Sequence, residues 1–269
     1  MLVVKVPGIN GLGKTFGCEK SGEAILAALK DFYSNENGNL LDEGNFNAEE
    51  ISVDNSDLST TKNIYLDSFK FFQSQKKIFF IGGDHSVSYY TSRAFFDNSQ
   101  NSGKESCLIV FDAHPDLMSP MQEPTHEEWL CKLIEDGFSP KNILLIGVRN
   151  SWKEEIDFIK KNKIKLVSCD DIALNLEDAT DVITEFVQGR ELYVSIDIDV
   201  CDPAFAPATG YNNEIGGLTS RQLLYILKRI NKIRTLRAID LVEINEKDDK
   251  EKFHGITVKL GAKILGEFL

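Results

Sequence analysis

Short apolar runs and amphipathic stretches alternate along most of this chain. The apolar runs predict β-strands at 3–6, 77–81, 107–111, 143–148, 164–168, 192–199 and 236–244. Between them, apolar residues recur every three or four positions and predict helices at 86–97, 127–136, 152–162, 179–188 and 220–231. A further helix is expected to start at Ser21. This alternation predicts an α/β fold, a three-layer α/β/α sandwich with a mostly parallel sheet.

The chain is interpreted as one domain, 1–269, because no Pro/Gly/Ser-rich linker or change of composition divides it. Its most polar part, 34–61, is expected to be an exposed loop with a short helix or strand inside it. In parallel sheets of this kind, ligands bind beyond the carboxyl ends of the strands. Candidate chemistry is therefore expected at that edge of the sheet.

The net charge of the chain excludes some classes of binding partner. A net charge of -12 at pH 7 argues against nucleic acid and anionic membranes, which attract basic patches. A small cationic substrate fits this charge better. The sequence has no signal-peptide pattern and no apolar run of about 18 residues, so a soluble, cytoplasmic protein is expected. Its five cysteines form no C-x-x-C pair, so we expect reduced thiols.

One short motif suggests a different function. Residues 8–15 read GINGLGKT, which satisfies the phosphate-loop pattern G-x-x-x-x-G-K-[ST] of nucleotide-binding proteins. That pattern binds phosphate only where a helix begins at its Lys-Thr. Here Gly17 and Gly22 lie where the first helical turns would be, and each costs a helix interior about 1 kcal/mol relative to alanine. A P-loop nucleotide-binding protein is thus kept only as an alternative.

Histidines and aspartates gather at the ends of the predicted strands. Six residues follow this rule: His85, Asp112, His114, Asp116, Asp197 and Asp199. Side chains two positions apart on a strand share one side, so the pairs 112/114 and 197/199 are each expected to point the same way. The carboxyl ends of parallel strands then predict a single polar cluster.

The carboxylates of this cluster need cations, because like charges in a partly buried site force one another to bind protons. Carboxylate oxygens together with imidazole nitrogens are typical of a divalent transition-metal site and favour Mn²⁺ over a thiolate-rich zinc site. Four carboxylates balance the charge of two dications. The residues therefore predict a metal site with two Mn²⁺ per chain.

The motifs together resemble the ureohydrolase family, which includes arginase, agmatinase and formimidoylglutamase. They are GGDHS at 82–86, DAHPD at 112–116, SIDIDVCDP at 195–203 and EIN at 243–245. They stand in the family's order and spacing over nearly the whole chain. The family's glycine-rich N-terminal loop also accounts for residues 8–15, so the phosphate-loop match is expected to be fortuitous. The resemblance implies an arginase-like fold and a homo-oligomer, either a trimer or a hexamer.

The resemblance also implies how the metals are held. One Mn²⁺ would bind His85, Asp112, Asp116 and Asp197. The second would bind Asp112, His114, Asp197 and Asp199, so that Asp112 and Asp197 bridge. Water between two such metals loses a proton near neutral pH. The implied reaction is attack on a guanidinium or amidine carbon, which releases urea, or a related amide, and an amine.

Two further residues take catalytic roles by resemblance. Glu243 would hold the guanidinium group, and His126 would carry protons to the leaving amine. Three departures from the family pattern concern the substrate. Glu127 follows His126 where the family usually has glycine. Arginases place Asn and Ser side chains in the loop after DAHPD to hold the amino acid head group, but the loop 117–124 reads LMSPMQEP and shows no evident clamp for its carboxylate. The segment 206–218 is also altered. These departures favour an agmatinase-like enzyme that converts agmatine to putrescine and urea.

Other functions are kept as alternatives. Arginase or formimidoylglutamase activity would need the same metal site with a different pocket. A catalytically idle relative that acts as an interaction module is expected to have lost metal ligands, yet all six candidate ligands are present. We therefore expect a hydrolase acting on a small guanidino or amidino substrate.

Overall fold

An eight-stranded sheet forms the centre of the protein, whose computed structural model describes residues 1–42, 44–211 and 214–269. Its strand order is β2-β1-β3-β8-β7-β4-β5-β6, and every pair of neighbouring strands is parallel. The strands are β1 (Leu2–Val6), β2 (Asn47–Glu50), β3 (Ile78–Gly82), β4 (Ser106–Phe111), β5 (Ile143–Ile146), β6 (Lys165–Val167), β7 (Glu191–Asp197) and β8 (Leu236–Val242).

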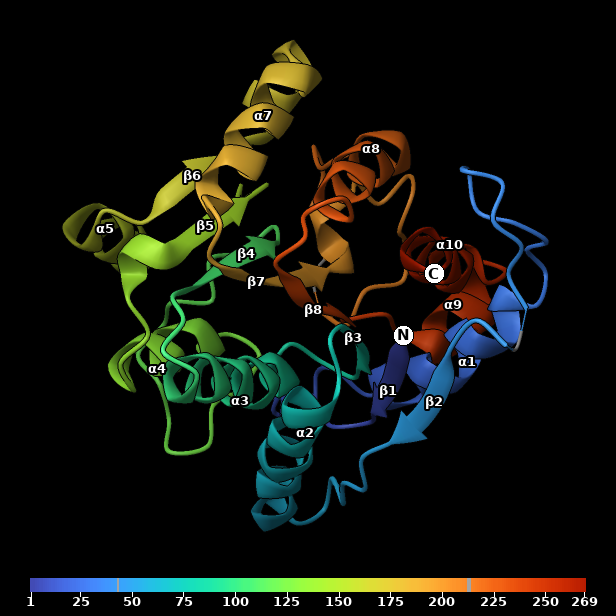
Figure 1. Ribbon diagram of the computed structural model, residues 1–269, viewed down its shortest axis with the longest axis horizontal. Helices are drawn as coiled ribbons and strands as arrows, with labels where there is room; N and C mark the ends of the chain where they lie inside the picture. Colours follow the sequence, from blue (N-terminus) through green and yellow to red (C-terminus); the bar gives the residue numbers. More distant parts are fainter. Residues whose placement is uncertain (43, 212–213) are drawn as a thin grey trace.

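Helices cover the sheet on both sides (Figure 1). They are α1 (Ser21–Leu29), α2 (Lys62–Ser74), α3 (Ser86–Asn101), α4 (Trp129–Glu135), α5 (Lys153–Asn162), α6 (Cys169–Leu174), α7 (Leu176–Val187), α8 (Ser220–Ile230), α9 (Glu246–Lys252) and α10 (Ile256–Phe268). Residues of α1, α7, α8 and α10 share one apolar core with the sheet, and residues of α2, α3, α4 and α5 share a second. The predicted three-layer α/β/α sandwich is confirmed.

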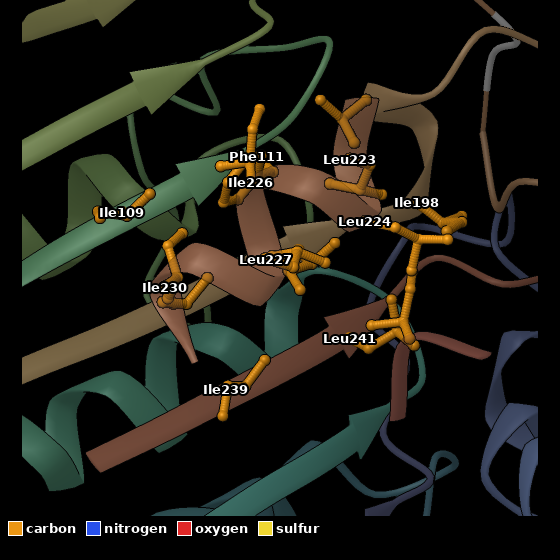
Figure 2. Packing of buried hydrophobic residues seen from close by; sticks show 14 of the residues in the cluster. Ile109, Phe111, Ile198, Leu223, Leu224, Ile226, Leu227, Ile230, Ile239 and Leu241 are labelled. Atoms are coloured by element: carbon orange, nitrogen blue, oxygen red, sulfur yellow. The ribbon is translucent and has the colours of Figure 1, made fainter. Parts of the chain in front are cut away.

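Alternation along each strand decides which core a residue joins. In β7, Val194 and Ile196 belong to the core on the α8 side, whereas Tyr193 belongs to the opposite core. Figure 2 shows the apolar side chains of α8 lying over Phe111 of β4 and Leu241 of β8. Burying one leucine or isoleucine side chain stabilises a fold by about 1.5–3 kcal/mol. The apolar stripe of α8 therefore suffices to hold that helix on the sheet.

Most predicted elements are present with bounds shifted by a few residues, as helix and strand ends usually are. The polar segment 34–61 contains β2 and a 3-10 turn at Leu58–Thr61, as expected. Four helices were not predicted: α2, α6, α9 and α10. Most residues of α10 are buried, so no polar face marks a helical period there. Within the described ranges, no helix is long and apolar enough to cross a membrane.

Four strands, β5, β6, β7 and β8, end earlier than predicted, and the ends of β7 and β8 belong to the candidate site. β7 stops at Asp197, and Ile198–Val200 form a 3-10 turn in which the Asp199 amide donates to Asp197 Oδ1 at 2.8 Å. The prediction that Asp197 and Asp199 lie on one strand is therefore wrong. β8 stops at Val242, and Glu243 has a φ of 63°. A positive φ is incompatible with continuing the strand to 244.

Residues 8–17 form a loop, and no helix begins at Lys14 or Thr15. A 3-10 turn at Cys18–Lys20 leads into α1, which starts at Ser21 as predicted. The Thr15 hydroxyl donates to Asp84 Oδ2 at 2.7 Å, and the backbone amide of Asn10 donates to the same oxygen at 2.6 Å. Asp84 thus accepts a hydrogen bond from the hydroxyl that a phosphate loop would offer to a metal ion. This loop therefore lacks the geometry of a nucleotide site.

Candidate metal centre and substrate pocket

The candidate residues meet because the strands that carry them are neighbours. The strands β3, β8, β7 and β4 lie side by side in that order. At their carboxyl ends stand His85, Glu243, Asp197 and Asp112, one from each strand. The sequence motifs at these ends are up to 158 residues apart along the chain, and the parallel sheet brings them to one edge.

The first group surrounds His85 Nδ1. This atom lies 3.0 Å from Asp112 Oδ2, 3.0 Å from Asp116 Oδ2 and 3.3 Å from Asp197 Oδ2. His85 Nδ1 and Asp112 Oδ2 are buried, and neither makes a hydrogen bond of acceptable geometry within the described residues. A buried nitrogen lone pair and several carboxylate oxygens that converge on one point fit a divalent cation.

The second group surrounds His114 Nδ1 and shares Asp112 with the first. His114 Nδ1 lies 3.0 Å from Asp199 Oδ2 and 3.5 Å from Asp112 Oδ1. Ligand atoms of Asp112, His114 and Asp199 lie within 4.8 Å of one another, as do those of His85, Asp112 and Asp116. The structure thus brings five of the six predicted ligands into two overlapping groups that could each hold a metal ion. The sixth, Asp197, lies beside the first group, with its Oδ2 atom 3.3 Å from His85 Nδ1.

Burial controls the charge of these groups. It raises the pKa of Asp116 to about 7 and the pKa of Asp197 well above its ordinary range, and neighbouring carboxylates add to both increases. Burial alone would also raise the pKa of Asp112, but contacts with His114 and His85 outweigh it and lower that pKa. The cluster therefore holds protons in the absence of a cation, and a bound dication would displace them.

A buried hydrogen-bond chain fixes the orientation of His85. His85 Nε2 lies 2.9 Å from Ser195 Oγ, and Ser195 donates to Asp240 Oδ1 at 2.7 Å. Tyr193 donates to Asp240 Oδ2 at 2.7 Å. Ionised Asp240 can only accept, so the Ser195 oxygen is left to accept from His85 Nε2–H. A single proton on Nε2 leaves the Nδ1 lone pair for a metal ion. Burial alone would lower the pKa of His85, but its contacts with Asp112, Asp116 and Asp197 outweigh burial and raise that pKa, so a metal ion would displace a proton from Nδ1.

Asp116 is held in an unusual conformation by a tryptophan. Its φ is 52°, in the left-handed region that few aspartates adopt. The indole Nε1 of Trp129, at the start of α4, donates to Asp116 Oδ2 at 2.7 Å. The same indole packs against the ring of His85, with 4.8 Å between ring centroids. Trp129 therefore positions two predicted ligands of the first group.

Glu243 and His126, the two residues given catalytic roles, are in contact. Glu243 Oε1 accepts from the His85 amide at 2.8 Å and lies 3.4 Å from His126 Nδ1. Burial alone would lower the pKa of His126, but its contact with Glu243 outweighs burial and raises that pKa to about 9. Gly210 packs so closely that a Cβ atom there would lie 1.7 Å from Glu243 Oε2. The glycine leaves room for this carboxylate.

A pocket of about 420 Å³ opens onto the cluster. It is lined by Lys14, His114, Asp116, Met118, His126, Glu127, Asn150, Ser151, Trp152, Glu155, Asp197, Asp199, Tyr211 and Glu243. Its inner part contains predicted metal ligands, Glu243 and His126, and its outer part contains Lys14, Glu127 and Tyr211. Of the altered segment 206–218, residues 212 and 213 lie outside the described residues.

Several residues of this site were not predicted from the sequence. Ser195 and Asp240 had a detectable signal, because a polar side chain on an otherwise apolar strand needs a buried partner. Lys14 was assigned to a fortuitous motif, yet it lines the pocket. Tyr211 lies in a loop and had no signal of its own.

Comparisons with known proteins agree with this geometry. The sequence model described as the arginase family matches residues 3–269. An arginase from Staphylococcus aureus (strain MRSA252) is 26% identical over 304 residues, which cover 99% of this chain and 98% of the arginase. An agmatinase from Bacillus subtilis (strain 168) is 31% identical over 191 residues, which cover 70% of this chain and 61% of the agmatinase. The solved structure of proclavaminate amidino hydrolase from Streptomyces clavuligerus superposes with a TM-score of 0.86 at 25% identity, covering 99% of this chain and 89% of that chain.

Proposed function

Since this chain belongs to the arginase family, we propose that it is a manganese-dependent hydrolase of a linear guanidino compound that releases urea and an amine. The family and its neighbours are hydrolases that act on amidino or guanidino groups. The observation that carries the proposal is the pair of overlapping His/Asp groups that share Asp112. When bound there, two divalent cations supply Lewis-acid chemistry and lower the pKa of water.

The donor set supports Mn²⁺ as the proposed metal. All six proposed ligands offer carboxylate oxygen or imidazole nitrogen, and no cysteine belongs to either group of potential ligands in the described part of the chain. Carboxylate and imidazole ligands suit manganese, whereas a thiolate-rich site would suit zinc. By analogy with the family motif, Asp112 and Asp197 are proposed to bridge the two ions. Asp112 has one oxygen directed at each group, as a bridge requires.

Glu243 is proposed to hold the guanidinium group. Its carboxylate is buried at the base of the pocket and is fixed by the His85 amide at 2.8 Å. A guanidinium presents several N–H donors in one plane and pairs well with a carboxylate. Beside it, His126 has a raised pKa of about 9 and therefore carries a proton at neutral pH. We propose that this proton passes to the leaving amine nitrogen.

Agmatine is the proposed substrate. The loop after Asp116 reads LMSPMQEP at 117–124 and offers none of the Asn side chains that hold an amino acid head group in arginases. Of the residues that line the pocket, only Lys14 carries a permanent positive charge. Once the proposed ions balance the charge of the metal ligands, the carboxylates of Glu127, Glu155 and Glu243 remain in the lining and favour a positively charged substrate. This supports a decarboxylated guanidine over arginine.

The test is urea release by Mn²⁺-loaded protein from agmatine, arginine, 4-guanidinobutyrate and 3-guanidinopropionate, with formamide detection for formimidoylglutamate. We expect the highest kcat/KM with agmatine. Arginine as the best substrate would overturn the agmatine assignment alone. No release of urea or formamide from any of these compounds, with two metal ions bound per chain, would overturn the proposed reaction. Light scattering of the same preparation would test the expected trimer or hexamer.

A further inference from the structure

Four side chains form a charged cluster at the outer part of the pocket: Lys14, His126, Glu127 and Tyr211. Lys14 Nζ donates to Glu127 Oε1 at 2.9 Å and lies 4.3 Å from the centroid of the Tyr211 ring. Glu127 Oε1 also lies 3.8 Å from His126 Nε2, and the Tyr211 ring meets the His126 ring edge-on at 5.6 Å. The cluster joins the loop at 8–17, the segment before α4 and the loop that follows residue 206.

His126 separates two carboxylates. Its Nδ1 atom faces Glu243 at 3.4 Å and its Nε2 atom faces Glu127 at 3.8 Å. Glu243 lies next to the proposed metal ligands, whereas the Glu127 side chain is 43% exposed at the pocket mouth. One imidazole ring and two short contacts therefore separate the proposed guanidinium site from Glu127. A short methylene chain can span such a distance.

Lys14 and Glu127 differ in how many of their polar atoms already have partners. Lys14 Nζ has Glu127 and the face of Tyr211 as partners. Glu127 uses only Oε1, because Oε2 makes no hydrogen bond or ion pair with the described residues. A carboxylate can accept on both oxygens, so Glu127 retains capacity for a second cation. The aromatic wall of Tyr211 also tolerates an ammonium group nearby.

Resting on the proposed function, we propose that Glu127 binds the distal ammonium group of a linear guanidino amine and thereby selects the substrate. Lys14 holds the Glu127 carboxylate at the pocket mouth. The guanidinium end then lies at Glu243, the methylene chain passes His126, and the ammonium group reaches Glu127. A substrate with a distal carboxylate would meet Glu127 with like charge. Only an ion pair between that substrate carboxylate and Lys14 would offset the repulsion.

The test compares two substrates that differ mainly in the charge of the distal end, agmatine and 4-guanidinobutyrate, in wild-type and Glu127→Gln proteins. We expect Glu127→Gln to raise KM for agmatine about ten-fold or more while kcat changes little, since a charge-assisted hydrogen bond is lost. The kcat/KM for 4-guanidinobutyrate should stay the same or rise. Glu127→Asp should recover part of the agmatine preference. Glu154→Gln, an exposed position on α5 outside the pocket lining, is the control for loss of one negative charge.

Two outcomes would overturn the assignment. An equal fall of kcat with both substrates and no change of KM would mean that Glu127 acts through His126. A wild-type preference for 4-guanidinobutyrate that Lys14→Met abolishes would place a carboxylate at Lys14 instead. Calorimetric titration with 1,4-diaminobutane gives a reading without turnover: Glu127→Gln should weaken its binding, and unchanged binding contradicts the assignment. If wild-type protein hydrolyses neither compound, the proposed reaction fails, while this titration still tests Glu127.

Discussion

Replacing Ser195 by alanine should weaken metal binding without unfolding the metal-free protein. The Ser195 hydroxyl lies between His85 Nε2, at 2.9 Å, and Asp240 Oδ1, at 2.7 Å. Burial raises the pKa of Asp240, and the nearby His85 and then the bonds from Ser195 and Tyr193 oppose that rise. As long as Ser195 donates to Asp240, it has no proton to donate to His85, so in that contact its oxygen accepts from His85 Nε2–H. The sheet therefore selects the tautomer whose Nδ1 can bind a metal.

The expected loss of metal affinity follows from losing this preference for one His85 tautomer. In Ser195→Ala, the His85 proton can move to Nδ1 and donate to carboxylates at 3.0 Å, so a metal ion has to displace it. Loss of the partner of a metal-binding histidine weakens metal affinity by about 10- to 100-fold. This corresponds to about 1.4–2.8 kcal/mol. Saturating metal should stabilise the variant by that much less than it stabilises the wild type.

Calorimetric titration with Mn²⁺ measures the affinity, and thermal unfolding with and without Mn²⁺ measures the linked stability. Tyr193→Phe is the matched control. The Tyr193 hydroxyl donates to the other oxygen of Asp240 at 2.7 Å, and no contact joins it to His85 in the described structure. Its removal leaves a buried Asp240 oxygen without this donor and should cost about 1–3 kcal/mol of stability in the metal-free and metal-loaded forms alike. The Mn²⁺ affinity of this control should stay near that of the wild type.

Wild-type affinity for both metal ions in Ser195→Ala would refute the tautomer argument. An equal loss of stability in both forms would show that Ser195 matters only for packing and hydrogen bonding inside the sheet. A large loss of affinity in Tyr193→Phe would mean that Asp240, rather than the Ser195 hydroxyl, controls the site. Each of these results is distinct from a selective loss of metal binding in Ser195→Ala.

Three further predictions test other parts of the structure. Asp112→Ala should abolish binding of both metal ions, because Asp112 belongs to both groups; a variant that retains two ions by metal analysis would contradict the bridging role. His126→Asn should lower kcat at least ten-fold while metal content stays at the wild-type level, since proton transfer contributes about 100-fold or more; unchanged turnover would remove His126 from the reaction. Glu36 accepts from Arg221 at 2.8 Å and from Lys228 at 3.0 Å, and these bonds lower its pKa from 4.5 to about 2. The stability that ionised Glu36 contributes to the fold is therefore fully present above about pH 4.5 and is lost as the pH falls toward 2. Glu36→Gln should thus lower the free energy of unfolding by no more than about 1 kcal/mol near neutral pH, and this difference should shrink in urea titrations at acidic pH.

The residues that meet in the two groups could be predicted because each follows an apolar run. A run such as CLIVF at 107–111 identifies a buried strand, and a parallel strand delivers the next residues to the carboxyl edge of the sheet. That β3, β8, β7 and β4 are neighbours has no local signature, because pairing joins segments far apart in the sequence. The resemblance to a family supplied the grouping of ligands that the strand pattern alone left open.

The strand ends were mispredicted because the alternating pattern continues beyond the last paired residue. In SIDIDV at 195–200, the polar residues alternate through Asp199, although the sheet ends at Asp197. The Asp197 side chain accepts from the Asp199 amide and closes a turn, and such side-chain bonds compete with strand pairing. The positive φ of Glu243 is similarly invisible to a pattern of apolar and polar residues. Both departures aim carboxylates into the pocket.

The residues proposed to choose the substrate were harder to predict than the residues proposed to hold the metal, because the two sets lie in different parts of the fold. The proposed metal ligands follow buried strands whose pattern is constrained by the core, whereas Lys14, Glu127 and Tyr211 lie in connecting segments. Only the tertiary fold brings Lys14 within 2.9 Å of Glu127 across more than a hundred residues of sequence. Loops tolerate such changes because they leave the packing of the sheet intact. An unchanged metal centre with a different pocket mouth is therefore what the physics of this fold leads one to expect when a family diversifies its substrates.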